Sequence, residues 1–405
     1  MKILHTSDWH LGKRLERFSR LEEQKNVMQE LCQMADDKEA DVVLVCGDLF
    51  DTYNPPTEAV DLFYKTLKQL SGNGERAVIA IAGNHDSPDR IEAPDPLARE
   101  CGIVLAGYPN SVIPPFSLDS GVTISESIPG YLRLKLPQHS YQFGLLFTPY
   151  ANEIRLKSFL GHENSEQRFR ELLTAFWQKT ATNLHREDVN VLAAHLLIVK
   201  TDQEIPEEPE EEKPILHLGG AQAILSQQLP SEVQYAALGH LHRHQKIDSV
   251  SCPAVYSGSP LAFSFSEAEQ QKYAVLIEVE PNSQATIEKL PLQSGKFLHK
   301  KRFTRVEDTL QWLTQNQDCY VELTMATPEF LSATERKQLS EAHEGIVSII
   351  PEPQSEKMDS GEHTQIDLNK SITELFIDYF LARHGQKPNK RLMDLFKQVL
   401  SEEPE

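Results

Sequence analysis

The stretch DVVLVCGDLFD, residues 41–51, places a β-branched apolar run immediately before a Gly-Asp pair. A short apolar run that ends in a turn signal predicts a strand buried on both faces. Residues 20–35 and 57–70, on either side of it, have apolar side chains at helical spacing, and AVIAIA at 77–82 repeats the strand pattern. Strands that alternate with helices predict an α/β fold with a largely parallel or mixed sheet covered by helices.

Polar side chains stand at the ends of the predicted strands. Further strands are expected at 2–7, 142–150, 189–198, 233–240 and 272–280. The strand ends carry carboxylates, an amide and imidazoles: Asp8, His10, Asp48, Asp51, Asn84, His85, Asp86, His195, His240 and His242. Loops at the carboxyl ends of strands in open α/β sheets converge on one crevice, so these groups are expected to meet. Together they supply enough oxygen and nitrogen donors for two metal ions.

Single residues of this set also have ordinary interpretations. Asp48 after a glycine is typical of a turn, and His195 within an apolar run is typical of a hydrogen-bonded core histidine. His240, His242 and His244 alternate along an extended segment, which fits either metal ligands or a polar strand end. Taken together, the motifs favour a shared metal site over these ordinary interpretations, because chance would have to produce every motif in order.

Other aromatic residues near the motifs have different expected roles. By strand parity His5 points away from the polar set, so it is expected to be structural, and Trp9 is expected to pack in the core. His244 is a candidate for contact with a ligand residue or with substrate. The remaining histidines of interest, His217, His343 and His363, are expected at the surface.

Composition bounds the class of protein. With 405 residues and 40% hydrophobic content, the chain is expected to form two or more domains. Its five scattered cysteines lack CxxC spacing, and no signal peptide or membrane-spanning run is evident, so a cytoplasmic protein with reduced thiols is expected. The net charge of −20 opposes binding to nucleic acid unless charge is segregated. Part of it lies in an acidic block, 202–214, that is expected to be a solvated loop.

The pattern changes after residue 294. Residues 1–294 are expected to form the main α/β domain, and alternating helical and extended patterns predict a small α+β module over 295–352. Residues 353–368 have the polar, irregular composition of a linker. Two amphipathic helices are expected within 369–405, and their apolar faces either pack on their own domain or dock on another chain.

The motifs D-x-H, G-D-x-x-D, G-N-H-[DE] and G-H-x-H, in that order, resemble those of the calcineurin-like metallophosphoesterase superfamily. They correspond here to 8–10, 47–51, 83–86 and 239–242. Longer stretches of the sequence resemble the SbcD family of bacterial exonuclease subunits, among them MKILHTSDWHLGK, VVLVCGDLFDTYNPP, ALGHLHRHQ and YSGSP. The resemblance implies a sandwich of mixed β-sheets flanked by helices, with a small α+β cap and a C-terminal helix pair.

The resemblance also implies the metal ligands. One ion would be held by Asp8, His10, Asp48 and His242, and the other by Asp48, Asn84, His195 and His240. Asp48 would bridge the two ions. This donor set without cysteine suits two Mn²⁺ ions, with Mg²⁺ or another divalent ion as the alternative, and argues against a structural zinc site.

Catalytic roles follow from the same resemblance. His85 would face the scissile phosphate, as a proton donor to the leaving oxygen or as a stabiliser of the transition state. Either Asp51 or Asp86 would orient His85, and the two remain equivalent candidates. The archaeal and eukaryotic nuclease relatives carry an extra catalytic histidine at the position that Asp51 occupies here. Which residue of this chain takes the place of that histidine is left open.

The implied activity is metal-dependent cleavage of phosphodiester bonds at DNA double-strand ends and hairpins, as a double-strand exonuclease and single-strand endonuclease. The implied partner is an SbcC-type coiled-coil ATPase, bound by 369–405, with the chain a homodimer within a heterotetramer. DNA contacts are expected from the cap, 295–352, and from basic residues, namely Lys13, Arg14, Lys300, Lys301 and Arg302. The alternatives are a phosphoesterase acting on phosphoproteins, cyclic nucleotides or small phosphodiesters, and a noncatalytic DNA- or ATPase-binding subunit, which would be expected to lack ligands.

Overall fold

The structure is a computed structural model that describes residues 1–156, 165–201, 223–248, 251–327, 330–352 and 371–384, with 388, 392–393 and 395–396. The chain divides into two compact units, Met1–Glu352 and Pro353–Glu405. The expected acidic loop at 202–214 and linker at 353–368 lie outside the described residues, as do His217 and His363.

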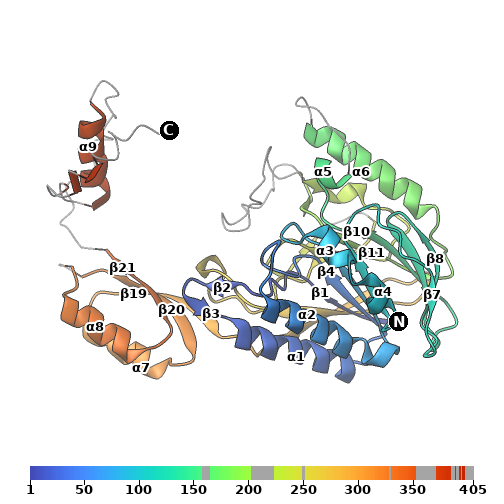
Figure 1. The fold of residues 1–405 in the computed structure, drawn as a ribbon, viewed down its shortest axis with the longest axis horizontal. Helices are drawn as coiled ribbons and strands as arrows, with labels where there is room; N and C mark the ends of the chain where they lie inside the picture. Colours follow the sequence, from blue (N-terminus) through green and yellow to red (C-terminus); the bar gives the residue numbers. More distant parts are fainter. Residues whose placement is uncertain are drawn as a thin grey trace. The chain divides into compact units, whose positions relative to one another are not determined.

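The first unit is built on two mixed β-sheets (Figure 1). One has the strand order β18(Thr286–Pro291)-β17(Tyr273–Glu278)-β1(Lys2–Thr6)-β4(Val42–Cys46)-β5(Ala77–Ile81)-β6(Ile103–Ala106). Strands β1, β4, β5 and β6 are parallel, whereas β17 pairs antiparallel with both β1 and β18. This is the central sheet expected from the alternating strands and helices of the first hundred residues.

The other sheet has the order β15(Gln245–Ile247)-β16(Ala254–Tyr256)-β14(Tyr235–Gly239)-β11(Val189–His195)-β10(Phe143–Thr148)-β9(Tyr131–Lys135)-β8(Thr123–Ile128)-β7(Phe116–Ser117). Strands β10, β11, β14 and β16 are parallel to one another. Short elements complete the unit: β2(Arg14–Leu15), β3(Phe18–Ser19), α3(Pro88–Glu92), α4(Asp95–Arg99), α5(Glu153–Leu156), β12(Ile198–Val199) and β13(Ile224–Leu225).

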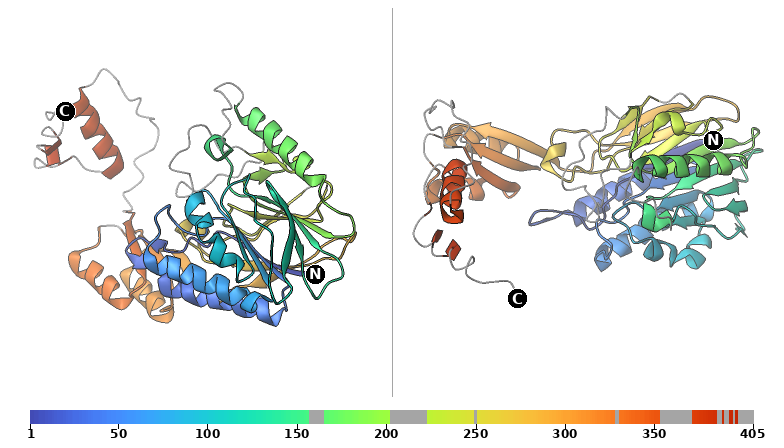
Figure 2. Two further views of the ribbon diagram at one scale, coloured as in Figure 1. Left: turned by 45° about the vertical axis from the view of Figure 1, so that its right-hand side comes forward. Right: turned by 90° about the horizontal axis from the view of Figure 1, so that it is seen from above.

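Three hydrophobic layers hold the sandwich together. Alternate residues of the two sheets, among them Leu44 and Val191, form the core between them. Helices α1(Leu21–Asp37) and α2(Thr57–Leu70) bury their apolar stripes on the outer face of the β1 sheet. Helix α6(Ser165–Ala181) covers the outer face of the other sheet, and Figure 2 shows it on the opposite side of the sandwich from α1 and α2. The fold class expected from the sequence is confirmed.

A smaller three-stranded sheet follows, with β19(Phe297–Phe303), β20(Cys319–Met325) and β21(Ile346–Pro351) all parallel. Helices α7(Val306–Gln315) and α8(Ala333–Ala342) connect these strands and share a hydrophobic core with them. A separate cluster contains Leu15, Ala262, Leu298 and Tyr320, so this module packs on the β2–β3 hairpin and on the segment before β17.

In the second unit, α9(Ile372–His384) is present where the first terminal helix is expected. Residues 392–393 and 395–396 are helical, whereas the end of the second expected helix lies outside the described residues. Among the described helices, none combines the length and the apolar character needed to span a bilayer.

One expectation about a histidine is wrong. His343 is only 2% exposed, because its ring lies between the Asn316 carbonyl, 2.8 Å from Nε2, and the Gly345 amide, 2.9 Å from Nδ1. It closes the turn between α8 and β21. His5 and Trp9 are buried as expected, and His5 contacts the Tyr235 hydroxyl and the Leu238 carbonyl.

Candidate metal centre

Strands of both large sheets end at the same edge of the sandwich. The loop after β1 carries Asp8 and His10, the loop after β4 carries Asp48, and the loop after β5 carries Asn84. The neighbouring sheet contributes the end of β11 and the loop after β14, with His195, His240 and His242. All seven predicted ligands are buried, with exposed fractions between 0% and 7%.

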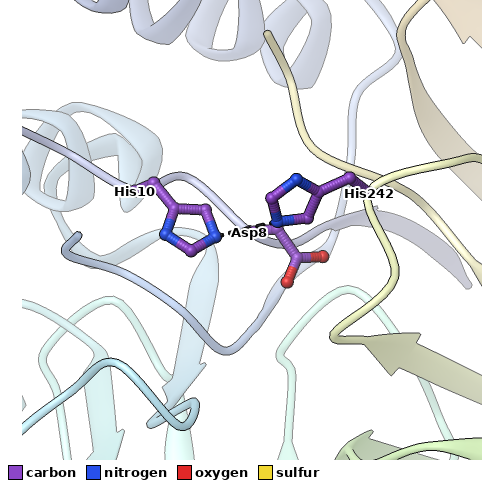
Figure 3. Close-up of side chains that lie close together, drawn as sticks. All are labelled: Asp8, His10 and His242. Atoms are coloured by element: carbon purple, nitrogen blue, oxygen red, sulfur yellow. Dashed lines mark hydrogen bonds between the residues drawn. The ribbon is translucent and has the colours of Figure 1, made fainter. Parts of the chain in front are cut away.

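Asp8, His10 and His242 form the first group of donors. One donor atom from each lies within 4.8 Å of the others. Nε2 of His10 is 2.9 Å from Nε2 of His242, and Figure 3 shows the two rings facing one another with the Asp8 carboxylate beside them. Asp48 Oδ2 is 3.6 Å from the same His10 nitrogen. The group therefore brings together the four donors expected for one ion.

The second group of donors centres on Asp48 and Asn84. His195 Nε2 is 3.4 Å from Asp48 Oδ2 and 2.9 Å from Asn84 Oδ1. His240 Nδ1 lies 3.0 Å from the same Asn84 oxygen. Asp8 also belongs to this group, since its carboxylate, that of Asp48 and the His195 ring have donor atoms within 4.8 Å of one another. Asp8 belongs to both groups, and Asp48 Oδ2 contacts one imidazole of each, His10 at 3.6 Å and His195 at 3.4 Å.

Four candidate ligands have left-handed backbone conformations, with φ of +54° at Asp8, +42° at His10, +47° at Asp48 and +107° at His240. Such conformations cost about 1 to 3 kcal/mol each for a side chain with a Cβ and persist only where the surroundings enforce them. Hydrogen bonds between the loops provide that restraint: Asp8 N donates to Gly47 O, His10 N to Asp48 O and His240 N to Asp8 Oδ1, each at 2.9 Å.

Two motif glycines are required by close approach of the backbone. A Cβ on Gly83 would lie 2.1 Å from Asp48 Oδ1, and one on Gly239 would lie 1.7 Å from the Cys46 carbonyl oxygen. Contacts this short are sterically forbidden, so only glycine lets the loops after β5 and β14 reach the loop after β4.

The charges of the site are strongly interdependent. Burial opposes ionisation of Asp48, but His195 and His85 nearby hold its pKa well below the usual value. Burial raises the pKa of Asp8, and the Asp48 charge adds to this effect. For His195, burial is outweighed by the carboxylates of Asp48 and Asp8, which raise its pKa to about 9 in the metal-free protein. A cation can take over the role of that ring proton, so the donor set fits a divalent metal ion.

His85 lies beside the donor groups. Its ring contacts the His10 ring edge-on, with 4.9 Å between centroids, and its backbone N–H donates to Asp48 Oδ1 at 2.9 Å. His85 Nδ1 is 2.9 Å from the backbone carbonyl oxygen of Asp51. Since a carbonyl only accepts, this contact places a proton on Nδ1 and turns Nε2 away from the Asp51 main chain.

The structure separates the two acidic residues proposed to orient His85. Asp51 contacts the His85 ring through its main chain, and its carboxylate lies 3.4 Å from Lys13 Nζ. The Asp86 carboxylate instead accepts hydrogen bonds from backbone N–H groups of the ligand loops, namely those of Gly83, Leu49 and Phe50, at 2.8 to 3.0 Å. Asp86 therefore holds together the loops after β4 and β5.

Two contributors were missed by the sequence analysis. Arg155, 4% exposed, donates to the carbonyls of Gly83 and Asp86, on either side of Asn84 and His85. Glu267 Oε1 lies 3.2 Å from His242 Nδ1. Neither residue belongs to a motif, and the only sequence signal is a charged residue close to an apolar segment.

The residues expected to contact DNA lie in two places. Lys13 and Arg14 follow the first donor loop, with Lys13 beside the Asp51 carboxylate and Arg14 exposed. Along β19, strand alternation puts Lys300 and Arg302 on one face and Lys301 on the other. A carboxylate lies 3.7 Å from Lys300, 2.7 Å from Arg302 and 3.1 Å from Lys301, so the β19 residues do not form one continuous basic strip.

The buried donor groups fit a metal-dependent phosphoesterase, and comparisons with known proteins agree. A family model described as calcineurin-like phosphoesterase matches residues 1–244, more than half of the chain. The chain is 34% identical over 410 residues to the D subunit of the SbcCD nuclease of Bacillus subtilis (strain 168), covering 99% of this chain and 98% of that protein. The corresponding subunit of Staphylococcus epidermidis is 28% identical, covering 70% and 67%, and that of Escherichia coli K12 is 26% identical, covering 83% and 81%.

The chain therefore belongs to the calcineurin-like phosphoesterase family. Within that class it belongs to the family of SbcCD nuclease D subunits. The resemblance stated from the motifs is confirmed, and with it the expected enzyme class, a phosphoesterase hydrolase of the nuclease type.

Proposed function

We propose that the chain cleaves phosphodiester bonds of DNA at a centre of two divalent metal ions, preferentially Mn²⁺. The observation that carries this proposal is the convergence of seven buried donors from five strand ends, with Asp48 near one histidine of each group. Asp8, His10, Asp48 and His242 hold one ion, and Asp48, Asn84, His195 and His240 hold the other. The oxygen and nitrogen donors suit Mn²⁺, and Mg²⁺ or a related ion is the alternative.

Two such ions, when bound, supply Lewis-acid assistance for in-line attack of water on phosphorus. The chain's own contribution is orientation and proton transfer. In its doubly protonated form, His85 would keep the Nδ1 proton on the Asp51 carbonyl and donate the Nε2 proton to the leaving oxygen. The hydrogen bonds between the donor loops keep the carboxylates in place before substrate arrives.

Duplex DNA ends and hairpins are the proposed substrates, with double-strand exonuclease and single-strand endonuclease activity. The relatives named above are nuclease subunits, which favours nucleic acid over phosphoproteins or small phosphodiesters. Lys13 and Arg14 are the best-placed phosphate contacts, because they follow the His10 loop closely. The module 295–352 would limit access from its side, with Lys300 and Arg302 on one face of β19 as further contacts.

The proposed partner is an SbcC-type coiled-coil ATPase, since the relatives are D subunits of a complex named SbcCD. The segment 369–405, which contains α9, is the proposed docking element, and the nuclease would act as a homodimer within a cytoplasmic heterotetramer. Deletion of 369–405 is expected to abolish co-purification with SbcC while leaving Mn²⁺-dependent phosphodiesterase activity intact. Retained co-purification would overturn this assignment.

The central test uses linear duplex DNA in Mn²⁺. Asp48→Ala and His85→Ala are each expected to fold but to lose nuclease activity. Asp61→Ala and His185→Ala serve as matched controls, because both residues lie at the surface, Asp61 beside Lys65 and His185 near Glu187. Undiminished cleavage by Asp48→Ala or His85→Ala would remove that residue from the site.

A further inference from the structure

A buried carboxylate stands directly behind the metal-ligand candidate His242. Glu267 ends a short 3-10 turn, Phe265–Glu267, and is 5% exposed. Its Oε1 lies 3.2 Å from Nδ1 of His242, on the side of the ring opposite to the nitrogen that faces His10. The same oxygen accepts the backbone N–H of Phe263 at 3.1 Å.

Lys272 completes the arrangement as the buried counter-ion of Glu267. Its Nζ donates at 3.0 Å to the backbone carbonyl of His242 and at 3.0 Å to Ser259 Oγ. The ion pair therefore holds both ends of one residue: Glu267 contacts the His242 ring, and Lys272 contacts its main chain. The buried ammonium of Lys272 thus compensates the charge of the buried Glu267 carboxylate.

Phe263 links this ion pair to the second imidazole of the first donor group. Its ring packs edge-on against His10, with 5.3 Å between centroids, and against His242 at 5.8 Å. Because Glu267 accepts the Phe263 backbone N–H, one carboxylate restrains both the hydrogen bonding of His242 and the aromatic residue on which the two rings rest.

We propose that Glu267 is a positioning residue for metal binding, acting through His242 with Lys272 as its support; this inference rests on the proposed metal-dependent function. A carboxylate that accepts the Nδ1 proton fixes the tautomer in which Nε2 presents its lone pair and makes that nitrogen a stronger donor. Loss of such a partner lowers metal affinity by about 10- to 100-fold in metalloproteins.

The same turn offers a control. Glu269, two residues after Glu267, pairs with His299 at 2.7 Å and Lys301 at 3.1 Å on β19, and its carboxylate is about half exposed. Glu269→Gln therefore removes a nearby carboxylate whose partners lie on β19 and are not candidate metal ligands. A second control is Asp188→Asn, which removes a buried carboxylate paired with Arg133 just before β11, at the opposite end of the strand from His195.

The test measures Mn²⁺ binding to the full-length protein by calorimetry, together with the Mn²⁺ concentration that gives half-maximal cleavage of linear duplex DNA. Glu267→Gln is expected to weaken Mn²⁺ binding by about 10-fold or more and to regain activity at saturating Mn²⁺. Both controls are expected to bind Mn²⁺ as the wild type does, even if Asp188→Asn is less stable. Glu267→Gln/Lys272→Met, which removes the stranded ammonium as well, is the second variant should the single one not fold.

Wild-type Mn²⁺ affinity in a folded Glu267 variant would overturn the positioning role while leaving the proposed nuclease function intact. The positioning role is equally overturned if excess Mn²⁺ fails to restore the activity of that variant. Absence of Mn²⁺ binding and cleavage in the wild type itself would instead overturn the proposed function on which the role rests. The two failures are therefore distinguishable in one experiment.

Discussion

Replacing Arg155 by methionine tests whether the loop that carries Asn84 and His85 must be held from behind. The guanidinium donates to Gly83 O at 2.8 Å and to Asp86 O at 2.7 Å, so it clamps the loop on either side of these two residues. It also donates to the Tyr53 hydroxyl at 3.1 Å and lies over the Tyr150 ring. Methionine keeps most of the aliphatic stem and removes all of the donors.

The expected magnitude follows from these contacts. Each hydrogen bond from a charged donor to a buried carbonyl contributes about 1.5 to 3 kcal/mol, so loss of the two is expected to lower the free energy of unfolding by about 3 kcal/mol or more. A shift of about 1 Å in a catalytic group lowers kcat by about 100-fold, and His85 is the group that the loop positions. Stability and kcat are therefore both expected to fall, with KM less affected.

The assay combines urea unfolding in chelator with steady-state DNA cleavage at saturating Mn²⁺. Arg133→Met is the matched control, because Arg133 is also a largely buried arginine with two carboxylate partners, Asp188 at 2.7 Å and Glu126 at 3.3 Å, but lies away from the site on β9. It is expected to lose stability and keep kcat. If Arg155→Met also kept a wild-type kcat, the clamp would be purely structural and the reasoning refuted.

Two further predictions follow from packing and from burial. Gly239→Ala is expected to weaken Mn²⁺ binding and to destabilise the protein, since its Cβ would lie 1.7 Å from the Cys46 carbonyl oxygen. Gly72→Ala is the control, because Gly72 has a positive φ but open space around it. Equal effects of the two substitutions in calorimetry and unfolding would contradict the steric argument. Burial lowers the pKa of His5 to about 3, whereas the unfolded chain titrates near its ordinary value of about 6.5, so the unfolded state binds the extra proton as pH falls through this window. Wild type is therefore expected to lose about 1.6 kcal/mol more stability than His5→Asn between pH 6.5 and pH 5, and parallel pH profiles in urea unfolding would disprove the shift.

The spacing of apolar residues predicted most of the helices and strands, because each element buries apolar side chains at the spacing of its own secondary structure. The apolar runs at 42–46 and 77–81 lie inside the sandwich, and the helical stripes of α1 and α2 pack on the outer face of the same sheet. The meeting of the candidate ligands was predictable for a related reason, whereas their division between two ions came from the family resemblance. Asp8, Asp48 and His195 sit at strand ends, which the topology brings to one edge.

The supporting residues were not predictable, because their role exists only through contacts between distant segments. Arg155 holds a loop that is 69 and 72 residues away in sequence, and Glu267 reaches His242 across 25 residues. No spacing rule connects either pair. The same limit applied to His85: the sequence offered two carboxylates as its orienting group, whereas its Nδ1 lies 2.9 Å from the main-chain carbonyl of Asp51, a contact that no spacing rule predicts.

The expectation for His343 was wrong because composition does not reveal tertiary partners. His343 was expected at the surface, but its ring is held in the turn before β21 by Asn316 and Gly345. Composition is equally silent on the acidic residues of other elements that lie beside Lys300, Lys301 and Arg302.

The most direct test of the central claim is anomalous diffraction from crystals soaked in Mn²⁺. We expect two manganese peaks, one in contact with Asp8, His10 and His242, the other with Asn84, His195 and His240, and both touching Asp48. Full Mn²⁺ occupancy at some other place, with no peak adjoining Asp48, would contradict a binuclear centre and the nuclease mechanism built on it.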